Sequence, residues 1–136
     1  MNARASYTVK KWDEATIREL PPGRKITKAS VQYQLSGDIE GNASVEYLMF
    51  YRHFDPADQH KASAAYVGLV HFDGTLSGKS GTFLLEDTGA FEAGEAKSRL
   101  QIIEGSGTGQ LERIHGTGFY VANKNGLRWE LDYDFD

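Results

Sequence analysis

The sequence contains no cysteine and only three prolines. Without cysteine, the chain forms no disulfide and offers no thiolate for zinc, an iron–sulfur cluster or nucleophilic catalysis. It also lacks any run approaching the roughly 20 apolar residues of a membrane helix, so we expect no membrane partner. Basic residues number 15 against 19 acidic ones, giving a formal net charge of −4. Because neutralising phosphates needs a basic excess, we expect no nucleic-acid partner.

At 136 residues, the chain has the length of one domain, and no linker or low-complexity tract divides it. We therefore predict a single domain over residues 1–136. The opening residues 1–6 lack the apolar stretch of a signal peptide, so the expected location is cytoplasmic.

Fifteen glycines beside three prolines favour many strands joined by tight turns. At the C-terminus, Trp129, Leu131, Tyr133 and Phe135 alternate with acidic residues, and this period of two is typical of a half-buried strand. Asn125-Gly126 is a strong hairpin-turn signal. Reading the whole chain in this way predicts eight strands, over residues 3–12, 26–40, 43–54, 63–75, 80–92, 95–104, 116–123 and 127–135.

Only two segments read as helical. Residues 13–20 begin with a capping Asp and stop at Pro21-Pro22, which fits at most two turns, and residues 109–116 fit one turn. Neither supplies the crossover of a parallel sheet. We therefore predict an all-β fold: a single closed, antiparallel, eight-stranded up-and-down β-barrel of lipocalin-like type, with a two-sheet sandwich as the alternative.

Two central strands are apolar on both faces. Leu48 and Phe50 lie opposite the Val45–Tyr51 face, and Val67 and Leu69 oppose Tyr66 and Val70. Strands of this kind usually have something covering each face. The interior would cover one face, and a partner subunit or a terminal segment would cover the other. We expect a homo-oligomer.

Several short sequence motifs resemble those of a known family. In order along the chain they are Val9-Lys10-Lys11-Trp12-Asp13, Gly37-Asp38-Ile39-Glu40-Gly41, Val45-Glu46-Tyr47-Leu48-Met49, Phe72-Asp73-Gly74-Thr75-Leu76, Gly78-Lys79-Ser80-Gly81-Thr82-Phe83, Gly105-Ser106-Gly107-Thr108-Gly109-Gln110-Leu111, Ile114-His115-Gly116 and Leu131-Asp132-Tyr133-Asp134. Together they resemble the bacterial family catalogued as domain of unknown function 3224. The resemblance implies a small closed β-barrel similar to that of plant allene oxide cyclase, and it brings no established activity, substrate or catalytic residue.

Cofactor and metal motifs are weak. His53-Phe54-Asp55 and His71-Phe72-Asp73 share a tripeptide, and Asp58 and His60 follow the first. No His-x-x-x-His spacing strengthens a metal site there, and an Asp that begins a turn explains the pattern better, so we predict no metal. Gly105–Gly109 lacks the sixth-position glycine of a dinucleotide loop and the Gly-Lys-Ser/Thr of a Walker loop. No cofactor is therefore expected.

Ionisable residues within strands are the candidates for chemistry. Glu46 and His71 are the candidate catalytic groups, and Arg52 and Arg99 are candidates to orient a ligand. Facing inward, a Glu or His in an apolar barrel serves as a general base. Facing outward, it is an ordinary solvated group or, for Glu46 and Arg99, a structural pair. Parity leaves both open, because these strands are apolar on both faces.

Aromatic residues make up 12% of the chain. An eight-stranded barrel has an interior just wide enough to be filled by side chains or to hold one small ligand. Gly68, Ala64 and Ala65 leave room on one strand. The function predicted from sequence is binding of a small apolar or amphipathic metabolite. The alternatives are an isomerase- or cyclase-like enzyme and a structural oligomer with a filled core. The residues predicted to contact the ligand, beside the two arginines, are Tyr47, Tyr51, Tyr66, Phe83, Trp129 and Tyr133.

Overall fold

The computed structural model describes residues 1–53 and 62–136 and is built almost entirely of strands. In chain order they are β1 (Asn2–Leu20), β2 (Arg24–Gly37), β3 (Ile39–His53), β4 (Ser63–Leu76), β5 (Lys79–Glu92), β6 (Glu95–Ile102), β7 (Ile114–Asn123) and β8 (Gly126–Phe135). One short 3₁₀ turn, η2 (Gly109–Leu111), precedes β7. The predicted all-β class and the helical turn near residue 109 are confirmed.

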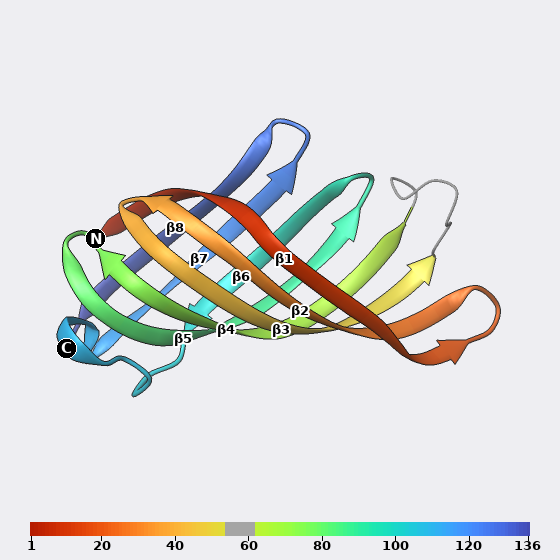
Figure 1. Ribbon diagram of the computed structural model, residues 1–136, viewed down its shortest axis with the longest axis horizontal. Coiled ribbons are helices and arrows are strands. Elements are labelled where there is room, and N and C mark those ends of the chain that lie inside the picture. The colour runs from red at the N-terminus through yellow and green to blue at the C-terminus, as the bar shows by residue number, and fades with distance from the viewer. Residues whose placement is uncertain (54–61) are drawn as a thin grey trace.

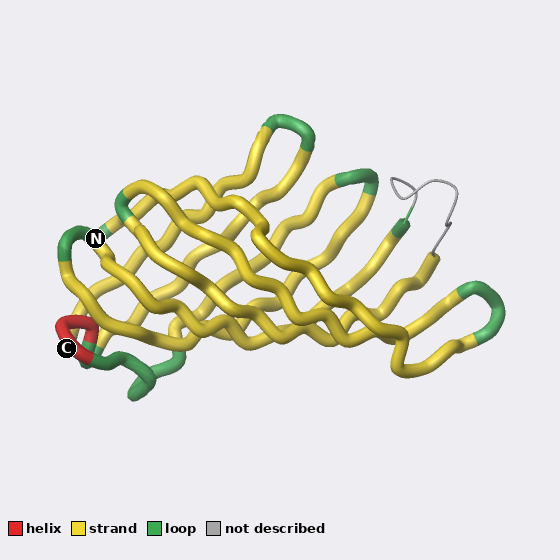
Figure 2. The backbone as a smooth tube through the Cα atoms, viewed as in Figure 1, coloured by secondary structure: helices red, strands yellow, loops and turns green. Residues whose placement is uncertain are grey.

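Each strand pairs antiparallel with the next one along the chain, and β8 pairs back with β1. The result is one sheet whose hydrogen bonds run in a ring (Figure 1). The two-sheet sandwich, our alternative, is therefore wrong. Figure 2 shows how little of the described chain lies outside strands: short turns at both ends and the segment around η2.

The ring closes over a short seam. β1 pairs with β8 only from Asn2↔Asp132 to Ser6↔Arg128, whereas it pairs with β2 as far as Leu20. Within the described residues, no strand pairs with the other edge of residues 7–20. The second half of β1 therefore extends past the seam as an edge of the sheet, paired on one side with β2, whose residues 25–35 pair in turn with β3.

The predicted helix over residues 13–20 is wrong, because this segment is the second half of β1. Pairing with β2 overrides the local signal, as cross-strand contacts do for short segments of mixed propensity. Two register shifts, between Val9 and Lys11 and between Thr16 and Arg18, break the alternation. Each shift moves the inward-facing set by one residue, so a period of two disappears from the sequence although the chain stays extended.

The interior has two ends, and large apolar side chains fill one of them. At the end where η2 lies, here called the closed end, the inward side chains are large, apolar and fully buried, among them Phe72, Phe83, Leu85 and Leu131. Leu111 of η2 and Ile114 are buried with them and cover this end. The turns at 21–23, 93–94 and 124–125 surround the other end, here called the rim end.

On the outer face of the sheet, Leu48, Val67 and Leu69 are each about half exposed (51–53%). Leu48 and Val67 are direct cross-strand partners on β3 and β4. The two-sided apolar character that the sequence indicates is therefore present, while the homo-oligomer inferred from it stays a prediction. No helix in the described parts of the chain is long and apolar enough to cross a membrane.

Candidate functional site

A cavity of about 620 Å³ occupies the rim end of the closed sheet. Aromatic side chains dominate its wall, and they include six of the seven tyrosines and both tryptophans. These residues are Tyr7, Trp12, Tyr33, Tyr47, Tyr51, Tyr66, Phe91, Tyr120 and Trp129. The smaller wall residues near the rim include Ala62, Ala64, Ala96 and Ala122. The cavity is thus apolar over most of its surface, with hydroxyl groups at defined places.

The floor of the cavity is formed by tyrosines whose hydroxyls belong to a hydrogen-bonded cluster around Asp87, which is 1% exposed and lies behind the lining residues. The Tyr47 hydroxyl donates to Asp87 Oδ2 (2.8 Å) and lies 2.9 Å from the Tyr120 hydroxyl. Tyr120 donates in turn to the Tyr66 hydroxyl (3.2 Å), which lies 2.6 Å from Ser98 Oγ. We call Tyr47, Tyr66, Asp87, Ser98 and Tyr120 the floor cluster. They come from β3, β4, β5, β6 and β7, so the floor ties together five consecutive strands.

Two glycines make this floor possible. A Cβ on Gly89 would lie 2.6 Å from Ser98 Oγ and 2.7 Å from the Tyr66 hydroxyl, so only glycine leaves room for those two groups to meet. A Cβ on Gly68 would lie 2.7 Å from Cδ1 of Tyr47. The space that the sequence indicated at Gly68 is therefore occupied by the Tyr47 ring, while Ala64 does line the cavity.

Burial sets the electrostatics of the floor. It raises the pKa of Asp87 from 3.8 to about 6, while the hydrogen bond from Tyr47 acts in the opposite direction. Burial also raises the pKa of Tyr33, Tyr47 and Tyr120 well above the ordinary value, and the nearby Asp87 charge adds to the rise. At neutral pH the tyrosines are therefore neutral donors around a single buried acid.

Three buried polar atoms have no hydrogen-bond partner among the described residues: Tyr33 Oη, Asp87 Oδ1 and Trp129 Nε1. Tyr33 and Trp129 line the cavity and pack edge to face, with ring centroids 6.0 Å apart. Buried polar groups of proteins are nearly always hydrogen-bonded, and an unmade bond costs about 1–3 kcal/mol. Two of these three atoms belong to residues of the cavity wall, and the third belongs to Asp87 behind it.

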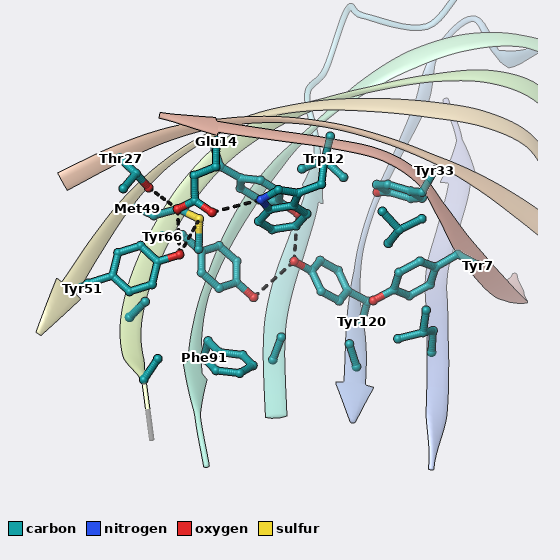
Figure 3. Close-up of a pocket in the computed structure, with 18 of the residues that line it drawn as sticks. Tyr7, Trp12, Glu14, Thr27, Tyr33, Met49, Tyr51, Tyr66, Phe91 and Tyr120 are labelled. Atoms are coloured by element: carbon teal, nitrogen blue, oxygen red, sulfur yellow. Dashed lines mark hydrogen bonds between the residues drawn. The ribbon is translucent and has the colours of Figure 1, made fainter. Parts of the chain in front are cut away.

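A second polar cluster lies at the rim end, centred on Glu14 of β1 (Figure 3). Its carboxylate accepts from Trp12 Nε1 (3.0 Å), the Thr27 hydroxyl (2.6 Å) and the Tyr51 hydroxyl (2.7 Å). The Lys25 ammonium lies 5.1 Å from the centre of the Tyr51 ring. The register shift after Val9 explains the position of Glu14, because it moves the inward-facing set from Tyr7 and Val9 to Trp12 and Glu14.

The structure divides the residues predicted to contact a ligand. Tyr47, Tyr51, Tyr66 and Trp129 line the cavity. Phe83 and Tyr133 lie instead in the core at the closed end, where Phe83 packs on Phe72 with centroids 5.1 Å apart and the Tyr133 hydroxyl donates to Ser77 Oγ (3.1 Å).

The predicted charged residues lie outside the cavity. Glu46 is exposed and accepts a hydrogen bond from Ser30 on the outer face, not from Arg99. His71 and Arg99 are exposed as well. Arg52 is also exposed and donates to Ser63 Oγ (3.3 Å), with Glu92 3.7 Å away. Neither candidate catalytic group, Glu46 or His71, therefore faces the interior.

The sequence reading missed Asp87, Tyr7, Tyr33 and Tyr120. A signal for Asp87 was present, because Phe83, Leu85, Asp87 and Phe91 share one parity on β5 and the first two are fully buried. The tripeptide His71-Phe72-Asp73 lies on β4 with its Phe buried, whereas residues 54–61 of the other candidate metal motif lie outside the described part of the chain. Among the described residues, no group of three His, Asp or Glu side chains converges on one point.

Comparison with known proteins gives a family and a fold. The family model described as protein of unknown function (DUF3224) matches residues 3–136. Among solved structures, the chain is similar to a protein of unknown function from the same family in Shewanella oneidensis MR-1. The two are 19% identical, with a TM-score of 0.77, over 100% of this chain and 98% of the other. No match was found among curated proteins.

Proposed function

The chain belongs to the DUF3224 family, and we propose that it is a small lipocalin-like barrel that binds an apolar or amphipathic metabolite. The single observation that carries this proposal is the 620 Å³ cavity at the rim end. Sites for small molecules typically measure about 300–1,000 Å³ and combine an apolar wall with a few placed polar groups. Both features are present here.

The distribution of side-chain size supports a binding cavity over a filled core. At the closed end, inward positions carry large residues such as Phe72 and Leu85. Toward the rim, inward positions on β4, β6 and β7 carry Ala64, Ala96 and Ala122. Alanine at three such positions leaves the middle of the ring open, whereas a core filled by side chains needs bulky groups from most strands.

The kind of aromatic residue points the same way. Tyrosine and tryptophan surround the cavity, while Phe72 and Phe83 lie in the core at the closed end. Tyrosine and tryptophan combine a large apolar ring with a polar atom, which suits a surface that contacts an amphipathic molecule. Phenylalanine has no such atom and suits a dry core.

An isomerase- or cyclase-like enzyme is the second candidate, now with a different acid from those the sequence indicated. Asp87 is a buried carboxyl group, and its pKa of about 6 suits proton transfer near neutral pH. Tyr47 links it by a hydrogen bond to the cavity wall. NMR separates the two candidates when a molecule recovered from the protein is incubated again with fresh protein. A binding protein leaves the molecule unchanged. An enzyme converts it to a rearranged isomer, and this conversion should stop in Asp87→Asn.

Native mass spectrometry of the freshly purified protein tests binding first. A species heavier than the chain, which loses a small molecule on denaturation, supports the proposal and identifies the molecule. A second test uses the neutral dye N-phenyl-1-naphthylamine, whose fluorescence rises in apolar sites. We expect saturable binding to the native chain, loss of binding in Ala122→Trp, which fills the cavity, and normal binding in Val121→Trp on the outer face. Equal binding by both variants, or none by the native chain, would overturn the proposal.

A further inference from the structure

The charges around the cavity are unbalanced. Among the described residues, the buried polar or charged set consists of Thr27, Asp87 and Ser98, so Asp87 is the one charged member. At the rim end, the cavity wall carries one carboxylate, Glu14, and one ammonium, Lys25. The described wall and floor therefore hold two acids and one base, and the uncompensated negative charge is the buried one.

Aromatic faces surround that buried charge. Burial is the main cause of the raised pKa of Tyr7, Tyr33, Tyr47, Tyr66 and Tyr120, and the charge of Asp87 adds to the rise at each of them. Their rings form a connected set: Tyr47 and Tyr66 pack with centroids 5.2 Å apart, Tyr7 and Tyr33 with centroids 5.2 Å apart, and Tyr7 and Tyr120 with centroids 5.8 Å apart. Figure 3 shows Tyr7, Tyr33, Tyr66 and Tyr120 drawn around the same space. The faces of aromatic rings carry negative partial charge and attract cations.

The carboxylate also has unused capacity. Tyr47 donates to Oδ2, while Oδ1 has no hydrogen-bond partner among the described residues and the side chain is 1% exposed. An ionised carboxylate accepts at both oxygens, and a buried one is normally paired with a positive charge. Inside this cavity the described residues provide no such partner.

From this placement we propose that the ligand is an organic cation: an amine or quaternary ammonium group attached to an apolar or aromatic body. The inference rests on the proposed binding function and names its ligand class. The cationic head lies at the floor, among the tyrosine rings and within the field of Asp87. The body extends toward the rim along Met49, Phe91 and Leu127, which line the outer part of the cavity.

Two other ligand classes fit less well. The free donors of Tyr33 and Trp129 would suit a carbonyl or carboxylate oxygen. An anion at the floor would, however, lie beside the negative charge of Asp87 in a site poor in water, where like charges repel strongly. A neutral molecule would use those donors and leave the carboxylate without a counter-charge.

Three matched probes test the ligand class: 2-phenylethylamine, which is a cation at pH 7.5, neutral 2-phenylethanol and anionic phenylacetate. Isothermal titration calorimetry gives the affinity of the native chain for each. We expect the amine to bind at least about tenfold more tightly than the alcohol, because a desolvated cation gains from both the carboxylate and the rings. Phenylacetate should bind more weakly than the alcohol.

The same titrations in two variants assign the effect to Asp87. Asp87→Asn keeps the size of the side chain and removes its charge, so most of the amine's advantage over the alcohol should disappear, and only the contribution of the rings should remain. Glu86→Gln removes the charge of the neighbouring exposed residue on the outer face and should leave the preference unchanged. Equal affinity of amine and alcohol in the native chain, or an unchanged preference in Asp87→Asn, would overturn the cation assignment.

The outcomes separate this inference from the binding function. If the alcohol and N-phenyl-1-naphthylamine bind but the amine has no advantage, the cavity is a binding site for neutral molecules and only the cation assignment fails. If none of the probes binds and the dye also fails, the binding function fails as well.

Discussion

Removing the charge of Asp87 should make the protein more stable at neutral pH and not at acidic pH. The carboxyl is buried, and its pKa in the folded chain is about 6 against 3.8 for the unperturbed group. An acid whose pKa is raised by folding binds its proton more tightly in the folded state. Its contribution is therefore most favourable below pH 3.8 and is lost as the pH rises through about 6.

The size of the effect follows from the two pKa values. Each pKa unit corresponds to about 1.4 kcal/mol, so the rise from 3.8 to about 6 corresponds to about 3 kcal/mol of folding free energy in total, of which about 2.4 kcal/mol is lost between pH 4 and pH 7.5. Asp87→Asn does not titrate and avoids this loss. For a chain of this length, about 3 kcal/mol is a difference of roughly 10 °C in melting temperature.

The assay is urea denaturation of the native chain and Asp87→Asn at pH 4 and pH 7.5. The side-chain oxygen of asparagine still accepts a hydrogen bond from Tyr47. Its NH₂ group, however, needs an acceptor at the place where Asp87 Oδ1 needed a donor. This change alters the stability of the variant by the same amount at both pH values. The informative quantity is the change in the stability difference between the two pH values. We expect the variant to gain about 2.4 kcal/mol relative to the native chain on going from pH 4 to pH 7.5. Groups common to both proteins cancel in that comparison.

The matched control is Glu86→Gln, one residue away on the outer face. Its stability difference should change little between the two pH values. If Asp87→Asn behaves like this control, the carboxyl is not the buried, poorly solvated group that the structure describes. In that case Asp87 would not place a buried negative charge beside the cavity, and the preference for a cationic ligand would lose its basis.

Three further predictions concern the floor, the rim and the outer face. Gly89→Ala should cost about 1–3 kcal/mol in urea denaturation, because its Cβ would displace Tyr66 from the floor; unchanged stability would contradict the tight packing. Glu14→Ala should cost about 1 kcal/mol by leaving the buried Thr27 hydroxyl unpaired, whereas Asp13→Ala, at the preceding position, should cost far less; equal losses would argue against the rim cluster. Sedimentation equilibrium should find more than one chain per particle and find single chains for Val67→Lys, and a monomeric native chain would refute the predicted homo-oligomer.

Most of the fold could be predicted from residue pattern alone. The strands over 63–75, 80–92 and 127–135 have bounds within one residue of the observed ones, because turn residues stand beside their ends. The last of these begins at an Asn-Gly hairpin turn, and sequential hairpins leave little choice of topology. A ring is then the simplest way to pair the two outermost strands.

The second half of β1 could not be predicted in this way. Its inward residues change parity twice, and the signal left in the sequence, Ile17 and Leu20 three apart, is that of a helical turn. Only the long pairing with β2 keeps residues 13–20 extended, and such a contact is not visible in a local window. Trp12 and Glu14 were lost from the predicted site for this reason.

The aromatic character of the candidate site was predicted from the sequence, but only some of its residues were. Tyrosines at alternate positions indicated an aromatic interior, and Tyr47, Tyr51, Tyr66 and Trp129 do line the cavity. The sequence did not indicate how far each residue lies from the rim end. Phe83 and Tyr133 face inward too, yet they lie in the core at the closed end. Parity gives the face of a residue, and only the stagger between strands gives its depth.

The number of paired residues differs between neighbouring strands of the ring, and this difference determines where the sheet should open locally. Ten residue pairs join β7 to β8, but only five join β8 to β1. Partial openings of a protein begin where the fewest contacts must break, so amides of Ala3 and Ala5 should exchange with solvent sooner than those at the centre of β4. Separation there would turn the ring into a curved open sheet while the other seven pairings stay intact. Tyr7 and Trp12 would move away with β1, and the residence time of a bound molecule would follow the fluctuations of a single strand.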